Sequence, residues 1–176
     1  QLQSSAASDV YKRQILLPGG PSLRGDWKGQ ELGSCTDCRR FWTELRAGNI
    51  TQDDYDSMEE SIYRSPGHCM VAGTASTMSV ISEAMGLTLK GAASIPAVDS
   101  RRLTLSNKTG QRIVEMVNEN IKIENFLKKE NFHNGISALM SFGGSTNAII
   151  HMLAIAGRTD VKLSLIHISE PTRPRI

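Results

Sequence analysis

The sequence predicts a helix-rich α/β fold, and three observations carry this prediction. Between residues 34 and 156 most segments have apolar side chains at helical spacing. Strand-like runs are few, because the apolar run at residues 15–17 ends directly at a Pro-Gly-Gly-Pro segment and the run at residues 87–98 is interrupted by Gly91 and Pro96. Hydrophobic residues make up 39% of the chain without any apolar run near the roughly 20 residues that span a bilayer. We therefore expect a globular core and no membrane segment.

The first elements alternate between extended and helical patterns. Residues 15–21 predict the end of a buried strand that breaks into a Gly/Pro turn, and residues 23–33 predict a polar loop. Residues 34–48 predict a helix with Ser34 or Thr36 as its N-cap and a glycine as its terminator.

A second helix is expected to begin after Thr51. Asp54 stands at the third helical position, which makes the pair a variant of the capping box. The apolar stripe of this helix consists of Tyr55, Met58 and Ile62.

Further helices are predicted toward the C-terminus. Residues 78–85 form a short helix stopped by Gly86, and residues 87–98 a buried connector or short strand. Asp99 or Ser100 can cap the next helix. The apolar positions of that helix are Ile113, Val114, Met116 and Val117.

The last two predicted helices cover residues 123–142 and 148–156. Between them, residues 143–147 read Gly-Gly-Ser-Thr-Asn, a Gly-rich helix start. The segment 148–156 is apolar all round, so we expect a buried helix. The side chains predicted to face inward from the earlier helix are Phe126, Leu127, Ile136, Leu139 and Met140.

The two ends of the chain differ from its middle. Residues 1–14 and 163–176 have no period that joins their neighbours, and we predict that both are translated sequencing-adapter sequence, with genuine tails as the alternative. These ends account for the whole net charge of +2, so the body at residues 15–162 is balanced and predicts no nucleic-acid or anionic-membrane partner. Three cysteines and no signal-peptide pattern predict a reducing, cytoplasmic compartment.

The strongest chemical signal lies at residues 65–78, which read Ser-Pro-Gly-His-Cys-Met-Val-Ala-Gly-Thr-Ala-Ser-Thr-Met. Cys69 stands here on a Gly-bounded loop directly before a helix start. A thiol in such a loop can bind a metal or a cluster, and the free N–H groups of the helix start can hold an anion. The alternative is a buried cysteine in a helical scaffold without chemistry, since free cysteines are often small core residues.

A different class of function follows from Cys35 and Cys38, which form a Cys-x-x-Cys pair at a predicted helix start. Together with His68 and Cys69 they would complete a four-ligand zinc set, or the pair would act as a redox couple. The alternative hypothesis is therefore a small zinc-binding or redox module.

Three separated motifs resemble the dihydroxy-acid dehydratase and sugar-acid (aldonate) dehydratase family. They are residues 65–78, residues 93–102 (Ala-Ser-Ile-Pro-Ala-Val-Asp-Ser-Arg-Arg) and residues 143–151 (Gly-Gly-Ser-Thr-Asn-Ala-Ile-Ile-His), in the family's order. The resemblance covers residues 15–162, and the family's enzymes are much longer. We therefore expect an internal fragment of the N-terminal α/β domain that is inactive by itself. The first motif is closer to the branch acting on aldonic acids such as arabinonate or xylonate than to the branched-chain biosynthetic enzymes.

The resemblance implies dehydration of a 2,3-dihydroxy acid to a 2-keto acid in a homo-oligomeric enzyme. An iron–sulfur cluster, 2Fe-2S or 4Fe-4S, would take the departing hydroxyl, and Mg²⁺ would bind the carboxylate end. Only Cys69 falls on a cluster-ligand position, Cys35 and Cys38 do not, and no catalytic residue lies in the fragment. The residues expected to line the substrate site are Thr74, Ser76 and Thr77.

Overall fold

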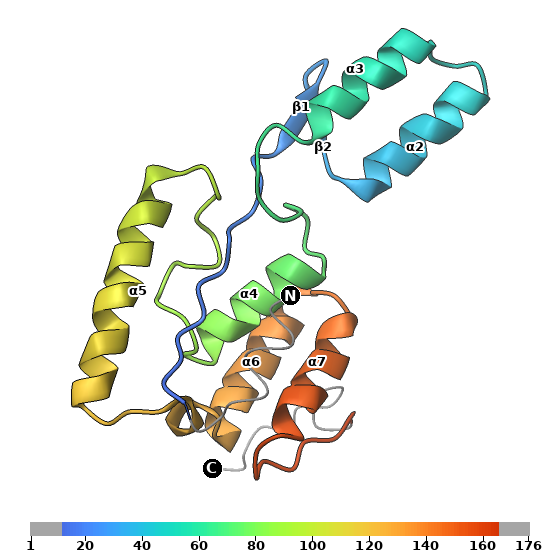
Figure 1. Cartoon of the computed structure of the whole chain (residues 1–176). Helices are drawn as coiled ribbons and strands as arrows, with labels where there is room; N and C mark the ends of the chain where they lie inside the picture. Colours follow the sequence, from blue (N-terminus) through green and yellow to red (C-terminus); the bar gives the residue numbers. More distant parts are fainter. Residues whose placement is uncertain (1–11, 166–176) are drawn as a thin grey trace.

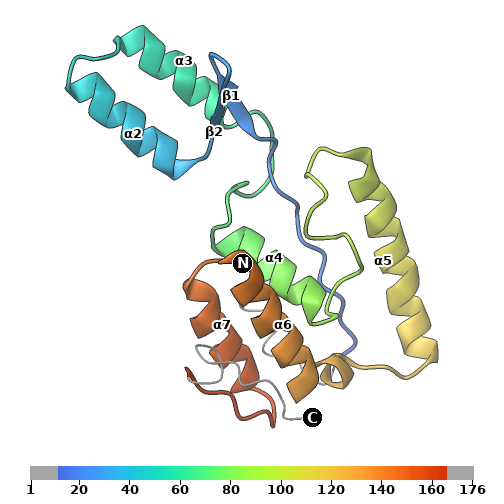
Figure 2. The ribbon, with the colours of Figure 1, turned by 180° about the vertical axis from the view of Figure 1, so that it is seen from behind.

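The chain divides into an outer lobe and a helical body, which two chain segments join (Figure 1). The computed structural model describes residues 12–165, so most of the predicted adapter sequence, residues 1–11 and 166–176, lies outside the described residues. Figure 2 shows from behind that the lobe projects away from the body. The helix-rich architecture with one small sheet agrees with the predicted fold class. Among the described residues, no helix combines the length and apolar character needed to cross a membrane.

The outer lobe begins with a β-hairpin. Strands β1 (Gly25–Trp27) and β2 (Gln30–Leu32) pair antiparallel. Both turn residues between them have positive φ, 51° at Lys28 and 77° at Gly29, as two-residue hairpin turns require. The prediction of a loop at residues 23–33 is therefore wrong. Lys-Gly is a weaker turn signal than Asn-Gly, and strands of three residues are too short to show an alternating pattern.

Two antiparallel helices complete the lobe. Helix α2 (Cys35–Arg46) and helix α3 (Gln52–Ile62) pack their apolar sides together. The predicted capping box is confirmed, since Thr51 and Asp54 bond each other's backbone N–H groups. The buried side chains of this small core are Leu32, Phe41, Met58 and Ile62.

The chain between the start of the described residues and the lobe is extended without forming a regular strand. The N–H of Leu16 donates to the carbonyl of Leu87 at 2.8 Å, and Pro21 makes one isolated parallel bridge with His68. The predicted strand end at residues 15–21 is therefore wrong. Proline has no N–H to donate, and two prolines in this segment limit its pairing.

The body is built around three packed helices, α4 (Thr74–Ala84), α6 (Lys129–Phe142) and α7 (Asn147–Ala156). Helix α4 begins four residues before the predicted start at residue 78, within the Gly-Thr-Ala-Ser-Thr motif. The buried core of these helices and their connections includes Ile81, Met85, Leu127, Phe132, Ile136, Leu139, Ala148 and Met152.

Helix α5 (Ser100–Asn118) lies along one side of the body (Figure 1). Of its two predicted N-cap residues, Asp99 and Ser100, the cap is Asp99, which accepts a hydrogen bond from the N–H of Arg101 at 2.8 Å. The connector before it contains no strand. Of the four apolar positions predicted for α5, Met116 is buried, whereas Val114 and Val117 are exposed.

The predicted helix at residues 123–142 is two elements. A short 3-10 turn, η1 (Ile123–Phe126), precedes α6, and the backbone leaves helical geometry at Leu127. Met140 is exposed rather than inward-facing. In α7, Ile150 keeps 66% of its surface exposed, so this helix is buried on one face and not all round.

Candidate functional site

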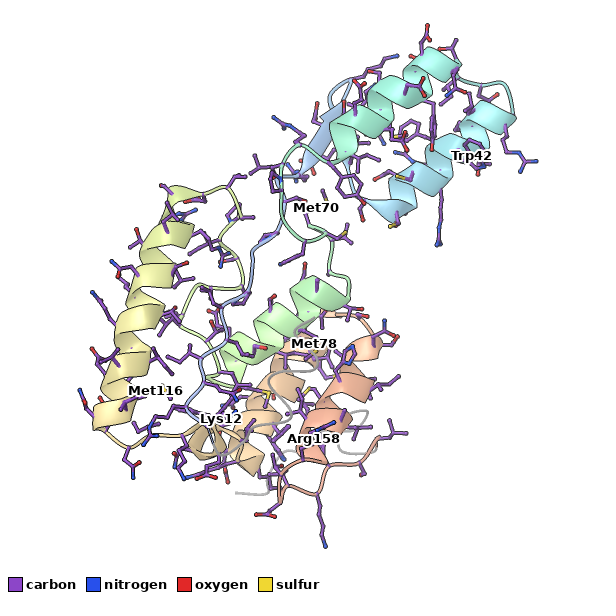
Figure 3. All side chains as sticks on the ribbon, in the orientation of Figure 1. Lys12, Trp42, Met70, Met78, Met116 and Arg158 are labelled. Atoms are coloured by element: carbon purple, nitrogen blue, oxygen red, sulfur yellow. The ribbon has the colours of Figure 1, made fainter. Side chains whose placement is uncertain are left out.

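The candidate site lies on the link of residues 63–73 between α3 and α4. Figure 3 marks this link by Met70. The link is held by the distant segment before the lobe: the N–H of His68 donates to Gly20 at 3.0 Å, and the N–H of Ser22 donates to His68 at 2.9 Å. Gly67 has φ 135°, and a Cβ there would overlap the backbone of Pro21 and Ser22. Only glycine fits this crossing.

Cys69 is half-buried and makes a polar contact. Its Sγ lies 2.7 Å from the Oγ of Ser34, which is 1% exposed. Of the two predicted N-cap residues, Ser34 and Thr36, it is Ser34 that precedes α2, but its side chain makes no capping hydrogen bond. The Ser34 hydroxyl thus contacts the Cys69 thiol and does not cap the N-terminus of α2. Cys69 is therefore not the buried hydrophobic cysteine of the scaffold alternative.

The backbone of Cys69 is fixed by its neighbours. Its carbonyl oxygen accepts a hydrogen bond from Ser76 Oγ at 3.1 Å and lies 2.9 Å from His68 Nδ1. The other ring nitrogen of His68, Nε2, is buried and has no hydrogen-bond partner within the described part of the chain. Two side chains thus orient the loop from opposite sides of Cys69 in the sequence.

Helix α4 begins at Thr74, five residues after Cys69. Its N-cap is Gly73, which has no side chain to bond the free N–H groups of the turn. The start of α7 lies against it: Thr74 Oγ1 is 3.1 Å from Ser145 Oγ and accepts a hydrogen bond from Asn147 Nδ2 at 3.0 Å. The structure therefore brings two of the predicted family motifs together at two helix N-termini.

Thr77 holds this junction from within. It is fully buried, and its hydroxyl accepts from the N–H of Ser145 at 3.0 Å while donating to the carbonyl of Ala72. A Cβ at Gly144 would overlap the Thr77 side chain. The three predicted hydroxyls thus differ in their surroundings. Thr74 is partly exposed and contacts the start of α7, Ser76 donates to the Cys69 carbonyl, and Thr77 is fully buried.

The Cys-x-x-Cys pair is placed on the first turn of α2. Cys35 is exposed, and Cys38 packs against the core of the lobe. Desolvation raises the pKa of the Cys38 thiol, and the nearby Cys35 and Glu59 charges raise it further. Reactive redox thiols have a lowered pKa instead. Within residues 12–165, no three His, Cys, Asp or Glu side chains form a group able to hold a metal ion, so the four-ligand zinc set is not assembled.

Sequence reasoning missed two charged side chains, Arg102 and Glu83, that hydrogen-bond backbone groups of the connector between α4 and α5. Arg102 is buried, and Nη1 donates to the carbonyls of Pro18 at 2.8 Å and Ala92 at 3.0 Å, while Arg101 pairs with Asp99 at the surface. Glu83 accepts hydrogen bonds from two backbone N–H groups of the connector, those of Gly91 at 2.6 Å and Ala93 at 2.9 Å. The available signal was the Gly- and Pro-rich connector itself, whose backbone groups need side-chain partners.

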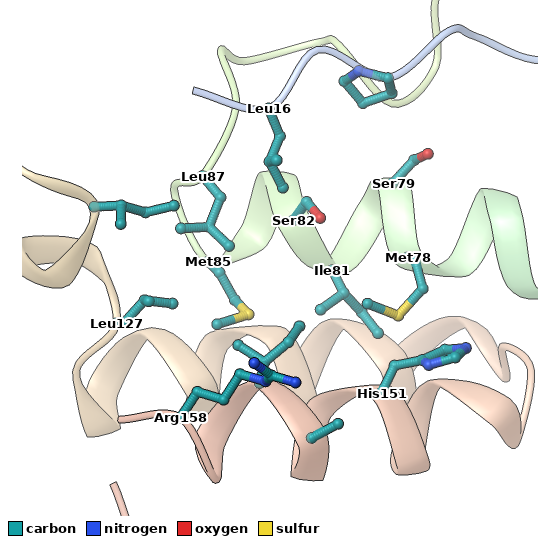
Figure 4. Close-up of a pocket in the computed structure, with 14 residues that line it drawn as sticks. Leu16, Met78, Ser79, Ile81, Ser82, Met85, Leu87, Leu127, His151 and Arg158 are labelled. Atoms are coloured by element: carbon teal, nitrogen blue, oxygen red, sulfur yellow. The ribbon is translucent and has the colours of Figure 1, made fainter. Parts of the chain in front are cut away.

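An apolar cavity of about 220 Å³ lies between α4 and α7 (Figure 4). Its walls are mostly Met, Ile and Leu side chains, with His151 and Arg158 from the α7 side. None of the predicted site residues lines it. The cavity belongs to the packing of the body and is separate from the Cys69 link.

Comparison with known proteins identifies the family. The family model described as dihydroxy-acid/6-phosphogluconate dehydratase N-terminal matches residues 4–174. A dehydratase of Rhizobium meliloti (strain 1021) is 50% identical over 94% of this chain and 28% of its own length. An L-arabinonate dehydratase of Rhizobium leguminosarum bv. trifolii is 44% identical over 93% of the chain and 28% of its own length. A dihydroxy-acid dehydratase of Sulfurisphaera tokodaii is 40% identical over 86% and 27%.

The chain spans somewhat more than a quarter of the length of these relatives. The matched model covers nearly all of it, including the Cys69 link and the junction of α4 and α7. The chain therefore belongs to the dihydroxy-acid/6-phosphogluconate dehydratase family and matches its N-terminal region.

Proposed function

We propose that the protein containing this chain dehydrates a 2,3-dihydroxy acid to a 2-keto acid, with aldonic acids such as arabinonate or xylonate as the substrate class. Family membership and the dehydratase relatives support the reaction type. The observation that supports a role for particular residues is the Cys69 link. In it a thiol comes shortly before the N-terminus of α4, which has no side-chain cap.

The reaction removes a proton from C2 and hydroxide from C3 of the substrate. The resulting enol becomes the 2-keto acid, so the balance is loss of one water. Hydroxide is a poor leaving group, and an iron–sulfur cluster, when bound, would supply the Lewis acid that takes it. The protein must therefore hold the acid group and orient the two carbons.

The residues of this chain fit one part of such a cluster site. Cys69 is a half-buried thiol on a loop whose backbone is fixed on both sides, and Ser34 Oγ is within hydrogen-bond distance of its sulfur. A hydrogen bond to a ligating sulfur orients it and tunes its basicity. No further ligand set for the cluster or for Mg²⁺ is gathered in residues 12–165, so by this proposal the other ligands come from the remaining length of the protein.

The helix junction supports binding of the substrate's acid end. The first-turn N–H groups of α4 have no side-chain cap, and an anion at a helix N-terminus interacts favourably with them. We propose that Thr74 contacts the substrate. Ser76 would hold the Cys69 loop in place, and the fully buried Thr77 would hold the start of α7, so that both would support the site rather than contact the substrate.

A chimeric enzyme tests this function. Residues 15–162 of this chain replace the matching segment of the L-arabinonate dehydratase, and keto-acid formation from L-arabinonate is measured. We expect activity in the chimera, a loss of about 100-fold or more in Cys69→Ser, and little change in the control Cys35→Ser. Equal losses in both variants would contradict the assignment of Cys69. Activity on a branched-chain dihydroxy acid alone would contradict the substrate class.

A further inference from the structure

Ser34 belongs to the outer lobe, yet its side chain contacts the candidate site. Its Oγ lies 2.7 Å from Cys69 Sγ, although the two residues are 35 positions apart in the sequence. Ser34 is 1% exposed, so water hardly competes for this contact. A hydrogen bond in such a buried place is electrostatically stronger than one in water, because the local dielectric is lower. The contact therefore ties the lobe to the Cys69 link at the sulfur itself.

The backbone of Ser34 turns its hydroxyl away from its own helix. Thr51, which caps α3, has the extended backbone of a common N-cap with ψ 166°, whereas Ser34 has ψ −103°. A serine at this position ordinarily accepts a hydrogen bond from an N–H of the first helical turn. Ser34 makes no such bond. Its hydroxyl is therefore available to the sulfur.

The residues around Ser34 hold this geometry. Asp37 accepts a hydrogen bond from the N–H of Gly33 at 2.5 Å, and its other carboxylate oxygen pairs with Arg40 at 2.7 Å. A Cβ on Gly33 would lie 3.2 Å from Asp37 Oδ2 and 3.4 Å from a methyl of Val71 on the Cys69 link. The backbone directly before Ser34 is thus fixed by α2 on one side and lies close to the link on the other.

The core of the lobe anchors the same segment. Leu32, two residues before Ser34, is 1% exposed, and Phe41 on α2 is 6% exposed. Both belong to a core cluster of the lobe that is distinct from the core cluster of the body. A residue that positions a ligand must itself be held by packing. Ser34 meets this condition, because it stands between two anchored residues of the lobe.

The chemistry of a ligating sulfur fixes the direction of the hydrogen bond. The form of cysteine that binds a metal is the thiolate, which has no proton to donate. A serine hydroxyl has one proton to donate. With Cys69 as a ligand, Ser34 is therefore the donor and Cys69 Sγ the acceptor. Hydrogen bonds to the sulfurs are among the factors that set the reduction potential of an iron–sulfur cluster.

We propose that Ser34 is a positioning residue for the cluster, and that the outer lobe holds it there to orient the Cys69 sulfur and to tune its charge. The inference rests on the proposed function, in which Cys69 is a cluster ligand, and extends it to a lobe that supplies no ligand of its own within the described residues. Ser34 acts through Cys69 and does not contact the substrate.

Measurements on the cluster of the anaerobically purified chimera test this role. They are the reduction potential and the half-life of the visible absorption in the presence of an iron chelator. Ser34→Ala removes the donor, and Ser34→Thr keeps a hydroxyl. Ser79→Ala is the matched control, because Ser79 is 3% exposed and its hydroxyl donates within α4, to the carbonyl of Ala75 at 2.9 Å.

Ser34→Ala should make the reduction potential more negative, because a thiolate without this hydrogen bond disfavours an added electron. It should also shorten the half-life about tenfold, as is usual when a supporting hydrogen bond of a metal ligand is lost. Ser34→Thr should stay close to the unmodified chimera in both measurements, and Ser79→Ala should match it. If Ser34→Ala holds no cluster, a full cluster content in Ser34→Thr still assigns the loss to the hydroxyl.

Three results would overturn the role of Ser34. They are an unchanged potential and half-life in Ser34→Ala, an equal loss in Ser34→Thr, which would assign the effect to packing, and an equal loss in Ser79→Ala. The variant Cys69→Ser keeps this outcome distinct from a failure of the proposed function. If Cys69→Ser loses the cluster while Ser34→Ala leaves it unchanged, only the role of Ser34 is wrong. If Cys69→Ser retains the cluster, or the unmodified chimera contains none, both proposals are wrong.

Discussion

The links that precede α3 and α4 each lead into a helix, but they are held in place by different contacts. The link before α3 is short and local: Gly48 ends α2 with φ 75°, and Thr51 and Asp54 cap the next helix. The link before α4 depends on distant chain, since His68 pairs with the segment before the lobe and Cys69 contacts Ser34. It also leaves the α4 N-terminus without a side-chain cap. Such non-local support around unsatisfied groups is typical of a functional loop on a fixed scaffold.

The largest difference between the links should appear at their glycines. Gly67→Ala places a Cβ against the backbone of Pro21 and Ser22 at a φ that L-residues avoid, and should cost about 3 kcal/mol or more of unfolding free energy. Gly48→Ala is the control, because its Cβ would meet nothing and only the positive φ counts, at about 1 kcal/mol. Urea denaturation measures both, and equal costs would contradict the comparison.

A smaller effect is expected at the buried hydroxyl of Thr77, within α4 itself. Thr77→Val keeps the shape of the side chain but leaves the N–H of Ser145 and the carbonyl of Ala72 without their partner, at about 2 kcal/mol. Thr51→Ala removes the exposed cap of α3 and should cost about 1 kcal/mol. Thermal unfolding of the two variants should rank them in this order, and the opposite ranking would show that the α4 junction is not held by Thr77.

Supplying the missing cap at α4 should separate stability from function. Gly73→Ser has a compatible φ of −79° and space for its Cβ, so it should stabilise the chain by about 0.3 kcal/mol. In the chimera the same change should raise the KM for L-arabinonate several-fold, because the serine side chain bonds the N–H groups proposed for the substrate. An unchanged KM would indicate that the substrate does not use this turn.

The smallest effect is a pH dependence confined to the α3 link. The hydrogen bond from Lys28, followed by that from Thr51, lowers the pKa of Asp54 in the folded chain. Its contribution to stability is therefore present above the unfolded pKa of about 3.9 and is lost as pH falls through the lower folded pKa. Helix α4 has no acidic residue in its first turn and should lack this dependence. Stability measured from pH 6 to pH 2 should show a flatter acid limb in Asp54→Asn than in the unmodified chain.

The sequence was most informative where the determining contacts are local. The capping box of α3 and the Asp99 cap of α5 involve residues two or three positions apart, and both were predicted. The hairpin at residues 25–32 was not, because its strands are short and Gly25 packs closely on the backbone of α3. The exposure of Val114 and Val117 was also missed, since periodicity shows that a face is apolar and not what covers it.

The candidate site was predictable in part for the same reason. The motif around Cys69 identified the loop and the helix start, which are neighbours in the sequence. The contact of Cys69 with Ser34 joins residues 35 positions apart, and the contact of Thr74 with Ser145 joins residues 71 positions apart. Local sequence patterns do not indicate contacts between residues so far apart in the chain. The zinc hypothesis failed on the same point, because spacing along the chain did not bring its four residues together.

The most direct test of the central claim, that Cys69 is a cluster ligand, is the iron and acid-labile sulfide content of the chimera. The anaerobically purified chimera should contain both, Cys69→Ser should lose most of each, and Cys35→Ser should retain them. A full iron and sulfide content in Cys69→Ser would contradict the claim. So would one tightly bound zinc per molecule of the isolated chain that disappears in Cys35→Ser.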